Sequence, residues 1–549
     1  MHGFRTHTFR WLRMLTLGAA VALALSACDW TMSGYNAART FDNTSESSLT
    51  TSNVGQLSLR FGTLLGSFDP APSTDTSPAV ANGSVYVAGD NGGLSVYDAA
   101  GVKGCTGDLP PACDAPLWTA AVPAATQHSS PTVVNGTVYL GGSDGKVYAF
   151  DAKGVTSCVA QDFGTRCSPL RTYAAGGPVA SSPAVVNNIL YVTAGPAGRT
   201  LYAFDAVGTT SCSGTPTSCA PLWSATLGGV ASDPTVAAGQ VYVGAGNGKI
   251  YAFDAAGATS CSGSPLVCAP LWTATLSGAS SSISTPAYAN GVLYATSADG
   301  RLYAVSATGT SCSGTPVTCA PLWRSSVSTR ASAPAVGPNT VYSATPGGIQ
   351  AFDAAGQSGC TGTPKTCTPL WTATGTTADT PAIANGVLYV GEQAGALKAF
   401  DAAGVISCSG APKTCQPLWA DGVSKGTPVI ANGTVYSRSQ DQTGCCLYRY
   451  LLAYSLVPPQ IKAATFYFAD GKVPVEGIGF PRSTNGVVTV TDNDQSNEVA
   501  STNFTTRTDG SFYDVEVNLP VWQCGDHISA TVTVGAITAS DQAILQCPG

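Results

Sequence analysis

Cysteine is the residue with the clearest chemical potential in this chain, because it occurs 19 times and most copies form regularly spaced pairs. Two residues that flank a β-turn face each other at a distance that suits a disulfide. Five of seven such pairs have six intervening residues, usually with Gly and Pro in the middle. The expected disulfides are Cys105–Cys113, Cys158–Cys167, Cys212–Cys219, Cys261–Cys268, Cys312–Cys319, Cys360–Cys367 and Cys408–Cys415.

Zinc binding is the alternative chemistry for these thiols. A structural zinc site needs about four ligands, whereas each pair supplies two and the whole chain has only 4 His. We therefore expect disulfides and no metal site, with each bridge holding a long hairpin that protrudes from one face of the molecule. Because disulfides persist in oxidising compartments, the pattern also predicts export from the cytoplasm.

The N-terminal residues support export. Arg5, Arg10 and Arg13 precede an apolar run from Leu15 to Leu25, which is too short to span a bilayer as a helix. The sequence Leu25-Ser26-Ala27-Cys28 follows, and it resembles the lipobox of bacterial lipoproteins. The resemblance implies a lipoprotein signal peptide over residues 1–27 and a lipid on Cys28; an ordinary signal peptide with a chance cysteine is the alternative. Residues 28–56 are rich in Ser, Thr and Asn, which predicts a flexible tether.

A unit of about 50 residues recurs between residues 57 and 456. In each copy, four short apolar, β-branched or aromatic runs alternate with turn residues, which predicts a four-stranded meander. The dipeptide that marks the second strand occurs eight times: Val85-Tyr86, Val138-Tyr139, Leu190-Tyr191, Val241-Tyr242, Leu293-Tyr294, Val341-Tyr342, Leu388-Tyr389 and Val435-Tyr436.

Four-stranded units at this period are typical of propeller blades, so we expect eight blades. The chain begins with an outer strand at residues 57–64 and ends on a third strand at Leu451 to Ser455. The first strand should therefore complete the last blade and close the ring. The Trp and Tyr residues at fixed positions of the blades should pack between blades, rather than stack on a ligand.

The cycle Ser-Pro-x-Val-x-Asn-Gly-x-Val-Tyr, then Gly-x-x-Tyr-Ala-Phe-Asp-Ala, then Leu-Trp resembles the PQQ-binding-like β-propeller repeat. That family includes quinoprotein dehydrogenases and the propeller lipoprotein that helps to assemble outer-membrane proteins. Quinoprotein alcohol dehydrogenases carry a vicinal disulfide beside their cofactor, and Cys445-Cys446 is an adjacent pair here. Their calcium ion, catalytic Asp and aromatic platform match no position in this chain, so the alternatives are a disulfide that closes a loop or pairing of these cysteines with something else. We expect no cofactor, with PQQ and calcium as the alternative.

The loops that enter the innermost strands should surround the central channel on one face. Most of their residues are Ser, Thr, Gly and Ala; the ionisable exceptions are Asp75, His128, Asp233, Arg330, Asp379 and Lys425. These six could form a funnel for a small anion, sugar or peptide, or be solvated loop residues. They contain no nucleophile–base pair, and His128 is the only His in the repeats. The sequence therefore predicts no catalytic residues.

After Pro458-Pro459, alternating strands predict a small β-sandwich over residues 460–549, which resembles bacterial Ig-like or transthyretin-like modules, with Cys524 and Cys547 as a pair. The expected fold is thus all-β: an eight-bladed β-propeller (57–457) followed by a sandwich. The net charge of −7 and the lack of a basic stripe argue against nucleic acid as a partner. The sequence favours a non-catalytic, lipid-anchored binding or scaffold module outside the cytoplasm, with the membrane and a protein or polymer as partners. A PQQ-dependent periplasmic dehydrogenase and a glycan-binding surface protein are the alternatives.

Overall fold

The computed structural model describes residues 28–545 except 69–75, 90–92, 107–109, 123–128, 162–163, 278–280, 310, 327–331, 376–377, 444–445, 459, 464–471, 481–483, 496–497, 508–510, 521–522, 524–525 and 536. Across these residues every regular element is a β-strand, apart from the 3-10 helices η1 (Val54–Gln56) and η2 (Pro196–Gly198). In the described part of the chain, no helix has the length and apolarity that crossing a bilayer requires.

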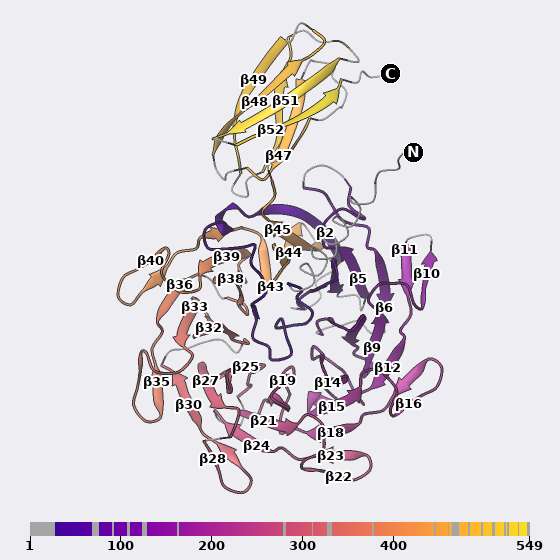
Figure 1. Cartoon of the computed structure of the whole chain (residues 1–549), viewed down its shortest axis with the longest axis vertical. Helices are drawn as coiled ribbons and strands as arrows, with labels where there is room; N and C mark the ends of the chain where they lie inside the picture. Colours follow the sequence, from indigo (N-terminus) through magenta and orange to yellow (C-terminus); the bar gives the residue numbers. More distant parts are fainter. Residues whose placement is uncertain are drawn as a thin grey trace, which may run out of the picture.

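Eight sheets of the described residues surround one axis, which confirms the predicted eight-bladed propeller (Figure 1). We number the blades 1 to 8 in chain order. The innermost strands are β3 (Ala79–Ala81), β7 (Thr132–Val134), β13 (Ala184–Val186), β19 (Thr235–Ala237), β25 (Ala287–Ala289), β31 (Ala335–Val336), β37 (Ala382–Ala384) and β43 (Ser424–Ala431). The second strands are β4 (Ser84–Ala88), β8 (Thr137–Gly141), β14 (Ile189–Ala194), β20 (Gln240–Gly244), β26 (Val292–Ser297), β32 (Thr340–Thr345), β38 (Val387–Glu392) and β44 (Thr434–Thr443).

Two further strands complete each blade. The third strands are β5 (Gly93–Asp98), β9 (Lys146–Asp151), β15 (Thr200–Asp205), β21 (Lys249–Asp254), β27 (Arg301–Ser306), β33 (Gly348–Asp353), β39 (Ala396–Asp401) and β45 (Cys446–Ser455). The fourth strands are β6 (Trp118–Ala121), β12 (Arg171–Ala174), β18 (Trp223–Thr226), β24 (Trp272–Thr275), β30 (Pro321–Ser325), β36 (Trp371–Thr374), β42 (Trp419–Ala420) and β2 (Ser58–Phe68).

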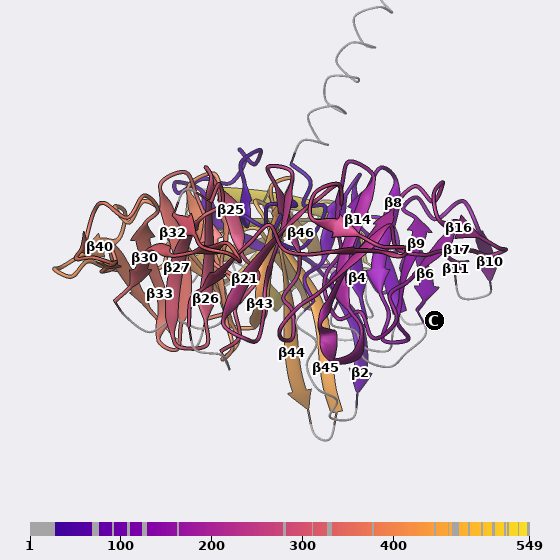
Figure 2. The same ribbon diagram turned by 90° about the horizontal axis from the view of Figure 1, so that it is seen from below.

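The ring closes as the repeat phase predicts, because the first long strand belongs to the last blade. β2 pairs antiparallel with β45, with Ser58 opposite Ser455 and Thr63 opposite Leu451. Figure 2 shows that β2, β44 and β45 extend beyond the other blades on one side of the ring. The two ends of the propeller are therefore joined by backbone hydrogen bonds, and no open sheet edge remains at the join.

Neighbouring blades are tied together by the residues that define the repeat. The hydroxyl of Tyr86 in blade 1 donates to the carbonyl of Ala152 in blade 2 (2.9 Å), and Tyr436 in blade 8 donates to Ala99 in blade 1 (3.1 Å). The fourth-strand Trp rings lie between blades, with Trp118 and Trp223 only 3 % and 1 % exposed. The prediction that Tyr and Trp pack between blades is therefore confirmed.

The seven predicted hairpin disulfides form, which indicates a chain that folds outside the reducing cytoplasm. The strands of these hairpins are β10 (Cys158–Gln161), β11 (Gly164–Cys167), β16 (Cys212–Ser213), β17 (Thr217–Cys219), β22 (Cys261–Ser262), β23 (Leu266–Cys268), β28 (Cys312–Ser313), β29 (Thr318–Cys319), β34 (Cys360–Thr361), β35 (Lys365–Cys367), β40 (Cys408–Ser409) and β41 (Thr414–Cys415). The cysteine pairs Cys445–Cys446 and Cys524–Cys547 lie outside the side chains that the structure describes, so those pairings stay predictions.

The expectation that the hairpins protrude from one face is wrong. Each hairpin lies at the rim of the ring (Figure 1), where its second strand adds in parallel to the outer edge of the preceding blade. The Cys105–Cys113 hairpin does the same to blade 8, where Cys113 N–H donates to Gly62 O (2.8 Å). The physical reason is the open outer edge of each sheet, whose backbone groups need partners.

The C-terminal region is a small β-sandwich, as predicted. A three-stranded sheet contains β46 (Gln460–Ala463), β47 (Lys472–Ile478) and β50 (Phe512–Asn518). A four-stranded sheet contains β48 (Asn485–Asp492), β49 (Glu498–Thr505), β51 (His527–Val534) and β52 (Ile537–Ile544). Val475, Val488, Phe512 and Val532 from both sheets share one buried core.

The turn that follows the third strand is held by the Asp that ends that strand. Asp205 Oδ2 accepts hydrogen bonds from the N–H groups of Thr209 and Thr210, at 2.7 Å and 2.6 Å. Burial tends to raise the pKa of Asp205, but these bonds, with those from the Thr209 hydroxyl and Val207 N–H, lower it to about 2. We call this segment, with the sequence Asp-Ala-x-Gly in most blades, the Asp–Gly turn.

The Asp–Gly turns of other blades pack against the preceding blade. Gly404 in blade 7 has φ +65°, and a Cβ there would overlap the indole of Trp371 in blade 6. We expect Gly404→Ala to lower the free energy of unfolding by about 3 kcal/mol, from overpacking of about 1–3 kcal/mol and backbone strain of about 1 kcal/mol. Chemical denaturation under oxidising conditions measures the loss. The matched control is Gly386→Ala, since Gly386 has φ +76° but open space around it; an equal loss in both variants would contradict the packing argument.

Acid should remove the contribution of Asp205 to stability. Its pKa is lower in the folded chain, about 2, than the ordinary Asp value of about 3.9. The carboxylate therefore stabilises the fold above about pH 4, and this contribution is lost as the pH falls towards about 2. We expect Asp205→Asn to lower the melting temperature at neutral pH, and the two melting curves to converge near pH 2. A difference that stays constant from neutral to acid pH would show that the charge of Asp205 does not stabilise the turn.

Candidate functional site

The central channel of the propeller is filled by the N-terminal part of the described chain (Figure 1). We call residues 28–43 the channel segment. Its carbonyl oxygens accept hydrogen bonds of 2.7–2.8 Å from the central N–H of the innermost strand in six blades. The donor–acceptor pairs are Val80–Trp30, Val133–Thr31, Val236–Ala37, Tyr288–Ala38, Val336–Thr40 and Ile383–Phe41. The segment also forms β1 (Asp42–Asn43), which pairs in parallel with β37.

The structure thus differs from the expected flexible tether over residues 28–56. The innermost strands turn one edge towards the channel, and the N–H groups of that edge need partners. The channel segment supplies carbonyl oxygens, which every residue type carries. A stretch rich in Ser, Thr and Asn can therefore be held in place without the apolar pattern that marks a buried strand.

Arg39 holds the channel segment against blades 3 and 4. Its side chain is 0 % exposed, and its guanidinium donates to the carbonyls of Ser182 (2.9 Å), Pro183 (3.2 Å) and Pro234 (3.2 Å), and to that of Ser33. Burial lowers the pKa of Arg39, and the nearby carboxylate of Asp233 opposes this. The cation is therefore held by backbone dipoles and one negative charge.

A tight turn folds the channel segment back on itself. Phe41 N–H donates to Gly34 O (3.0 Å), and Gly34 has φ +77°. A Cβ on Gly34 would lie 2.9 Å from Cδ of Arg39, closer than real Cβ contacts allow. Glycine is therefore needed at this turn for both its backbone conformation and its lack of a side chain.

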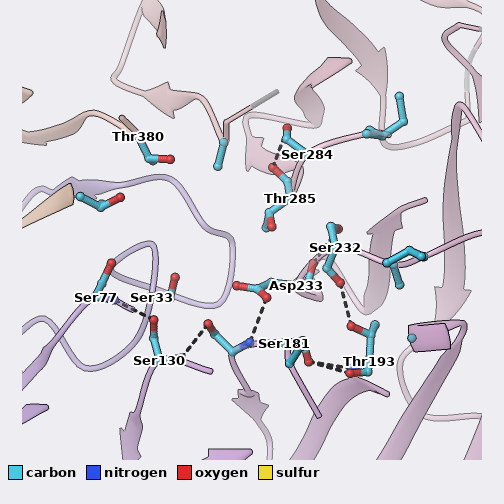
Figure 3. Close-up of a pocket in the computed structure, with 18 of the residues that line it drawn as sticks. Ser33, Ser77, Ser130, Ser181, Thr193, Ser232, Asp233, Ser284, Thr285 and Thr380 are labelled. Atoms are coloured by element: carbon cyan, nitrogen blue, oxygen red, sulfur yellow. Dashed lines mark hydrogen bonds between the residues drawn. The ribbon is translucent and has the colours of Figure 1, made fainter. Parts of the chain in front are cut away.

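A polar pocket of about 410 Å³ lies at the end of the channel where the chain enters the innermost strands (Figure 3). The residue before the proline in every blade lines it: Ser77, Ser130, Ser182, Asp233, Thr285, Ala333, Thr380 and Thr427. Ser33 and Phe41 of the channel segment also line it. The pocket is therefore a ring of equivalent positions, one from each blade, closed on one side by the channel segment.

Neighbouring members of this ring bond to each other (Figure 3). Ser77 N–H donates to Ser130 Oγ (2.9 Å), Ser130 N–H to Ser182 Oγ (3.1 Å), and Ser182 N–H to Asp233 Oδ1 (2.9 Å). Each of these side chains thus fixes the loop of the blade before it. The walls of the pocket are held by hydrogen bonds between blades, which keeps its shape set before any ligand arrives.

Of the three predicted funnel residues that the structure describes, one lies in the pocket. Asp233 lines it, whereas Asp379 and Lys425 do not; Asp379 Oδ2 accepts the N–H of Gly426 (3.1 Å). The predicted funnel residues Asp75, His128 and Arg330 lie outside the described residues. The described lining consists mainly of the Ser and Thr residues of these loops, with Asp233 as the member of the predicted funnel.

Sequence reasoning missed two parts of the site. Arg39 lies in a stretch without pattern, and its partners in the blades follow it by 143 to 195 residues, so no local signal marks it. The residue before proline carried a usable signal, because it recurs in all eight copies as Ser, Thr, Asp or Ala.

The pocket offers hydroxyl groups and one carboxylate. Its described lining contains no nucleophile with a base in reach, and its charged groups, Asp233 and the buried Arg39 beside it, have opposite sign. Hydroxyls both donate and accept hydrogen bonds. The arrangement therefore suits an uncharged polar ligand held by hydrogen bonds rather than a covalent step.

PQQ with calcium does not fit this lining. Calcium takes about six to eight oxygen ligands, among which carboxylates are prominent, but among the described lining residues Asp233 is the one carboxylate. Phe41 is the one aromatic ring of that described lining, and it belongs to the channel segment rather than to a blade. Among all described residues, no three His, Cys, Asp or Glu side chains gather so that they could hold a metal ion.

Cys28 begins the described chain and has no disulfide partner within it. Its thiol donates to the carbonyl of Ser45 (2.9 Å), and Asn43 Nδ2 donates to the carbonyl of Cys28 (3.0 Å). Burial raises the pKa of the thiol, and the nearby carboxylates of Glu46 and Asp29 raise it further. The residue is thus fixed where the channel segment begins.

Comparison with known proteins gave one family match: the family described as "Outer membrane protein assembly factor BamB" matches residues 50–172, 194–404 and 269–449. Among solved structures, the computationally designed Ika8 protein has 14 % identity and a TM-score of 0.48, covering 72 % of this chain and 99 % of its own. BamB from Moraxella catarrhalis has 16 % identity and a TM-score of 0.46, with the same two coverages. The comparison with curated proteins gave no match.

Loss of the Arg39 guanidinium should loosen the channel segment. Arg39→Leu leaves buried carbonyls without donors, and we expect unfolding to become easier by about 2–5 kcal/mol. Hydrogen exchange should also speed up at the N–H groups of Val236 and Tyr288, which donate to Ala37 and Ala38. The control is the exposed Arg199, where Arg199→Leu should change neither measurement. Unchanged exchange at Val236 in the Arg39 variant would contradict the proposed role.

Proposed function

Because the chain belongs to the family described as outer membrane protein assembly factor BamB, we propose that it is a non-catalytic binding or scaffold module, anchored by a lipid outside the cytoplasm. The observation that carries the proposal is the filled channel. Backbone of the chain itself occupies the axis of the ring, so the surfaces left for partners are the faces, the rim and the hydroxyl-lined pocket. A fold alone does not determine function, but these surfaces favour recognition over chemistry.

The proposed processing and domain order of the chain are inferred from its sequence motifs. Residues 1–27 are the lipoprotein signal peptide, Cys28 carries the lipid, residues 57–457 are the propeller and residues 460–549 are an Ig-like module. The apolar run before Cys28 and the seven disulfides support export. A lipid on Cys28 would hold the propeller at a membrane surface.

A protein is the partner that the family name favours, since the name describes an assembly factor for outer-membrane proteins. Only 10 % of the residues are charged, so we expect surfaces with few charges. Such surfaces bind by shape and hydrogen bonds rather than by long-range charge attraction.

Binding of a glycan or another small polyol is a second candidate function, and the pocket is the observation that favours it. The hydroxyls of Thr285, Thr380 and Thr427 line a pocket of about 410 Å³, and Phe41 gives it an apolar side. This volume falls within the usual range of about 300–1,000 Å³ for small-molecule sites. The candidate concerns the pocket alone and leaves the rest of the surface to a protein partner.

Lipid attachment should depend on Cys28. We expect metabolic labelling with an alkyne-tagged fatty acid to label the wild-type chain and to leave Cys28→Ser unlabelled and no longer retained in the membrane fraction. Asp29→Ser is the control, because it changes the next residue and keeps the thiol. Label in Cys28→Ser, or none in the wild type, would contradict the lipid anchor.

Reconstitution tests the non-catalytic role. After incubation of the full chain with PQQ and calcium, we expect no cofactor absorbance in the gel-filtered protein and no dye reduction with alcohols or sugars. A known quinoprotein dehydrogenase, treated in parallel, shows that the assay works. Stable cofactor absorbance together with turnover would overturn the proposal and favour a dehydrogenase.

A further inference from the structure

The propeller has two distinct faces, and Cys28 lies on the face opposite the pocket. The turns between first and second strands lie beside the Asp–Gly turns; in blade 1, for example, Ala99 N–H donates to Gly83 O (3.0 Å). We call this side the turn face. Asp29, next to Cys28, accepts hydrogen bonds from Asn82 N–H (3.0 Å) and Asn432 Nδ2 (3.1 Å), which belong to these turns in blades 1 and 8. Cys28 is therefore held on the turn face between those two blades.

The three most exposed large apolar side chains of the described residues lie on this face. Val155, Val102 and Val405 are 73 %, 71 % and 69 % exposed, and all three directly follow the Gly of an Asp–Gly turn. Three further exposed side chains lie close by: Val207 is inside an Asp–Gly turn, Ile406 follows Val405, and Leu456 directly follows the third strand of blade 8. We call these six side chains the aliphatic arc.

The aliphatic arc covers only part of the ring, and Cys28 is at its centre. Its members belong to blades 7, 8, 1, 2 and 3, which are consecutive because the ring closes between blades 8 and 1. At the position that follows the turn Gly, blade 4 has Ala258 and blade 6 has Gln357. The apolar side chains thus surround the point at which the proposed lipid would leave the protein.

Single exposed apolar side chains are common on protein surfaces and do not by themselves indicate a binding surface. Here the same turn carries them in successive blades, and two of these turns also carry an exposed lysine, Lys103 and Lys153. Apolar side chains beside lysines are what the headgroup region of an anionic bilayer attracts. The Asp side chains of these turns accept backbone N–H bonds, as Asp98 does from Val102 and Lys103, which offsets part of their charge.

We propose that the aliphatic arc is a membrane-contact surface, which lays the turn face against the lipid headgroups around the anchor. The inference rests on the proposed lipid anchor at Cys28 and adds an orientation to it. The turn face meets the bilayer, while the pocket and the long strands β2, β44 and β45 point away from it. The membrane then holds the propeller at several points, so that it cannot swing freely about one lipid.

The test measures adsorption without the lipid. Residues 28–549 with Cys28→Ser, which span all the described residues and replace only the Cys28 thiol, are incubated with sucrose-loaded vesicles of phosphatidylethanolamine and phosphatidylglycerol and then sedimented. We expect adsorption of this parent chain. Four substitutions in the arc, Val102→Ser, Val155→Ser, Val405→Ser and Ile406→Ser, should lower the partition coefficient about tenfold or more.

Matched controls keep the result specific. Val267→Ser with Val423→Ser removes two valines that are 51 % and 53 % exposed but lie outside the arc, on a rim hairpin and before the innermost strand of blade 8. This variant should adsorb like the parent chain. Lys103→Gln with Lys153→Gln should weaken adsorption by about fivefold per lysine on phosphatidylglycerol vesicles, and leave it unchanged on phosphatidylcholine vesicles. Melting curves of all variants check that each is folded.

The outcomes separate this proposal from the anchor itself. No adsorption of the parent chain, equal loss in the arc and control variants, or no loss in the arc variant would each overturn the membrane-contact surface. If fatty-acid labelling of Cys28 succeeds while the parent chain fails to adsorb, the lipid anchor is supported and the membrane-contact surface is contradicted. If labelling fails while adsorption depends on the aliphatic arc, the membrane-contact surface is supported and the lipid anchor is contradicted.

Discussion

Unpaired backbone groups on the inner edges of eight small sheets are the constraint on which the rest of this structure depends. A ring of eight blades leaves a channel, and every innermost strand turns an edge towards it. Buried N–H groups without partners would destabilise the fold. The channel segment supplies carbonyls to six blades, Arg39 contacts the carbonyls of a seventh, and Asn43 Nδ2 donates to Ile430 O of the last (2.8 Å). What remains for a ligand is the end of the channel, and this explains why the site is a polar pocket built from loops.

The blades also complete one another at larger radius. Tyrosine hydroxyls of one blade reach the Asp–Gly turn of the next, and each disulfide hairpin adds strands to the blade before it. A blade taken alone would therefore lack partners on its inner edge, its outer edge and both faces. Cooperation between blades has to replace the stability that a single four-stranded sheet cannot supply.

The sequence predicts the features that repeat and misses those that do not. Eight copies of one dipeptide gave the number of blades, the phase of the repeat gave the pairing of β2 with β45, and short Cys spacing gave the hairpin disulfides. The course of the channel segment cannot be predicted from a residue pattern, because its hydrogen bonds are accepted by backbone carbonyls, which every residue has. The place of the hairpins on the preceding blade was missed for a related reason: it follows from the open edge of a neighbouring sheet, which appears only once the ring is assembled. Asp233 was found by its charge, whereas its companion Arg39 lies 194 residues earlier in the chain.

The course of the channel segment has a consequence for the order in which the molecule is made. Trp30 bonds to the first blade and Asn43 to the last, so these residues, which precede every blade in the chain, have all their partners only after the final repeat has been made. The propeller thus assembles around a segment that is already in place. If Cys28 carries the proposed lipid, a pulling force on that lipid would act on a segment bonded to all eight blades rather than on one blade alone.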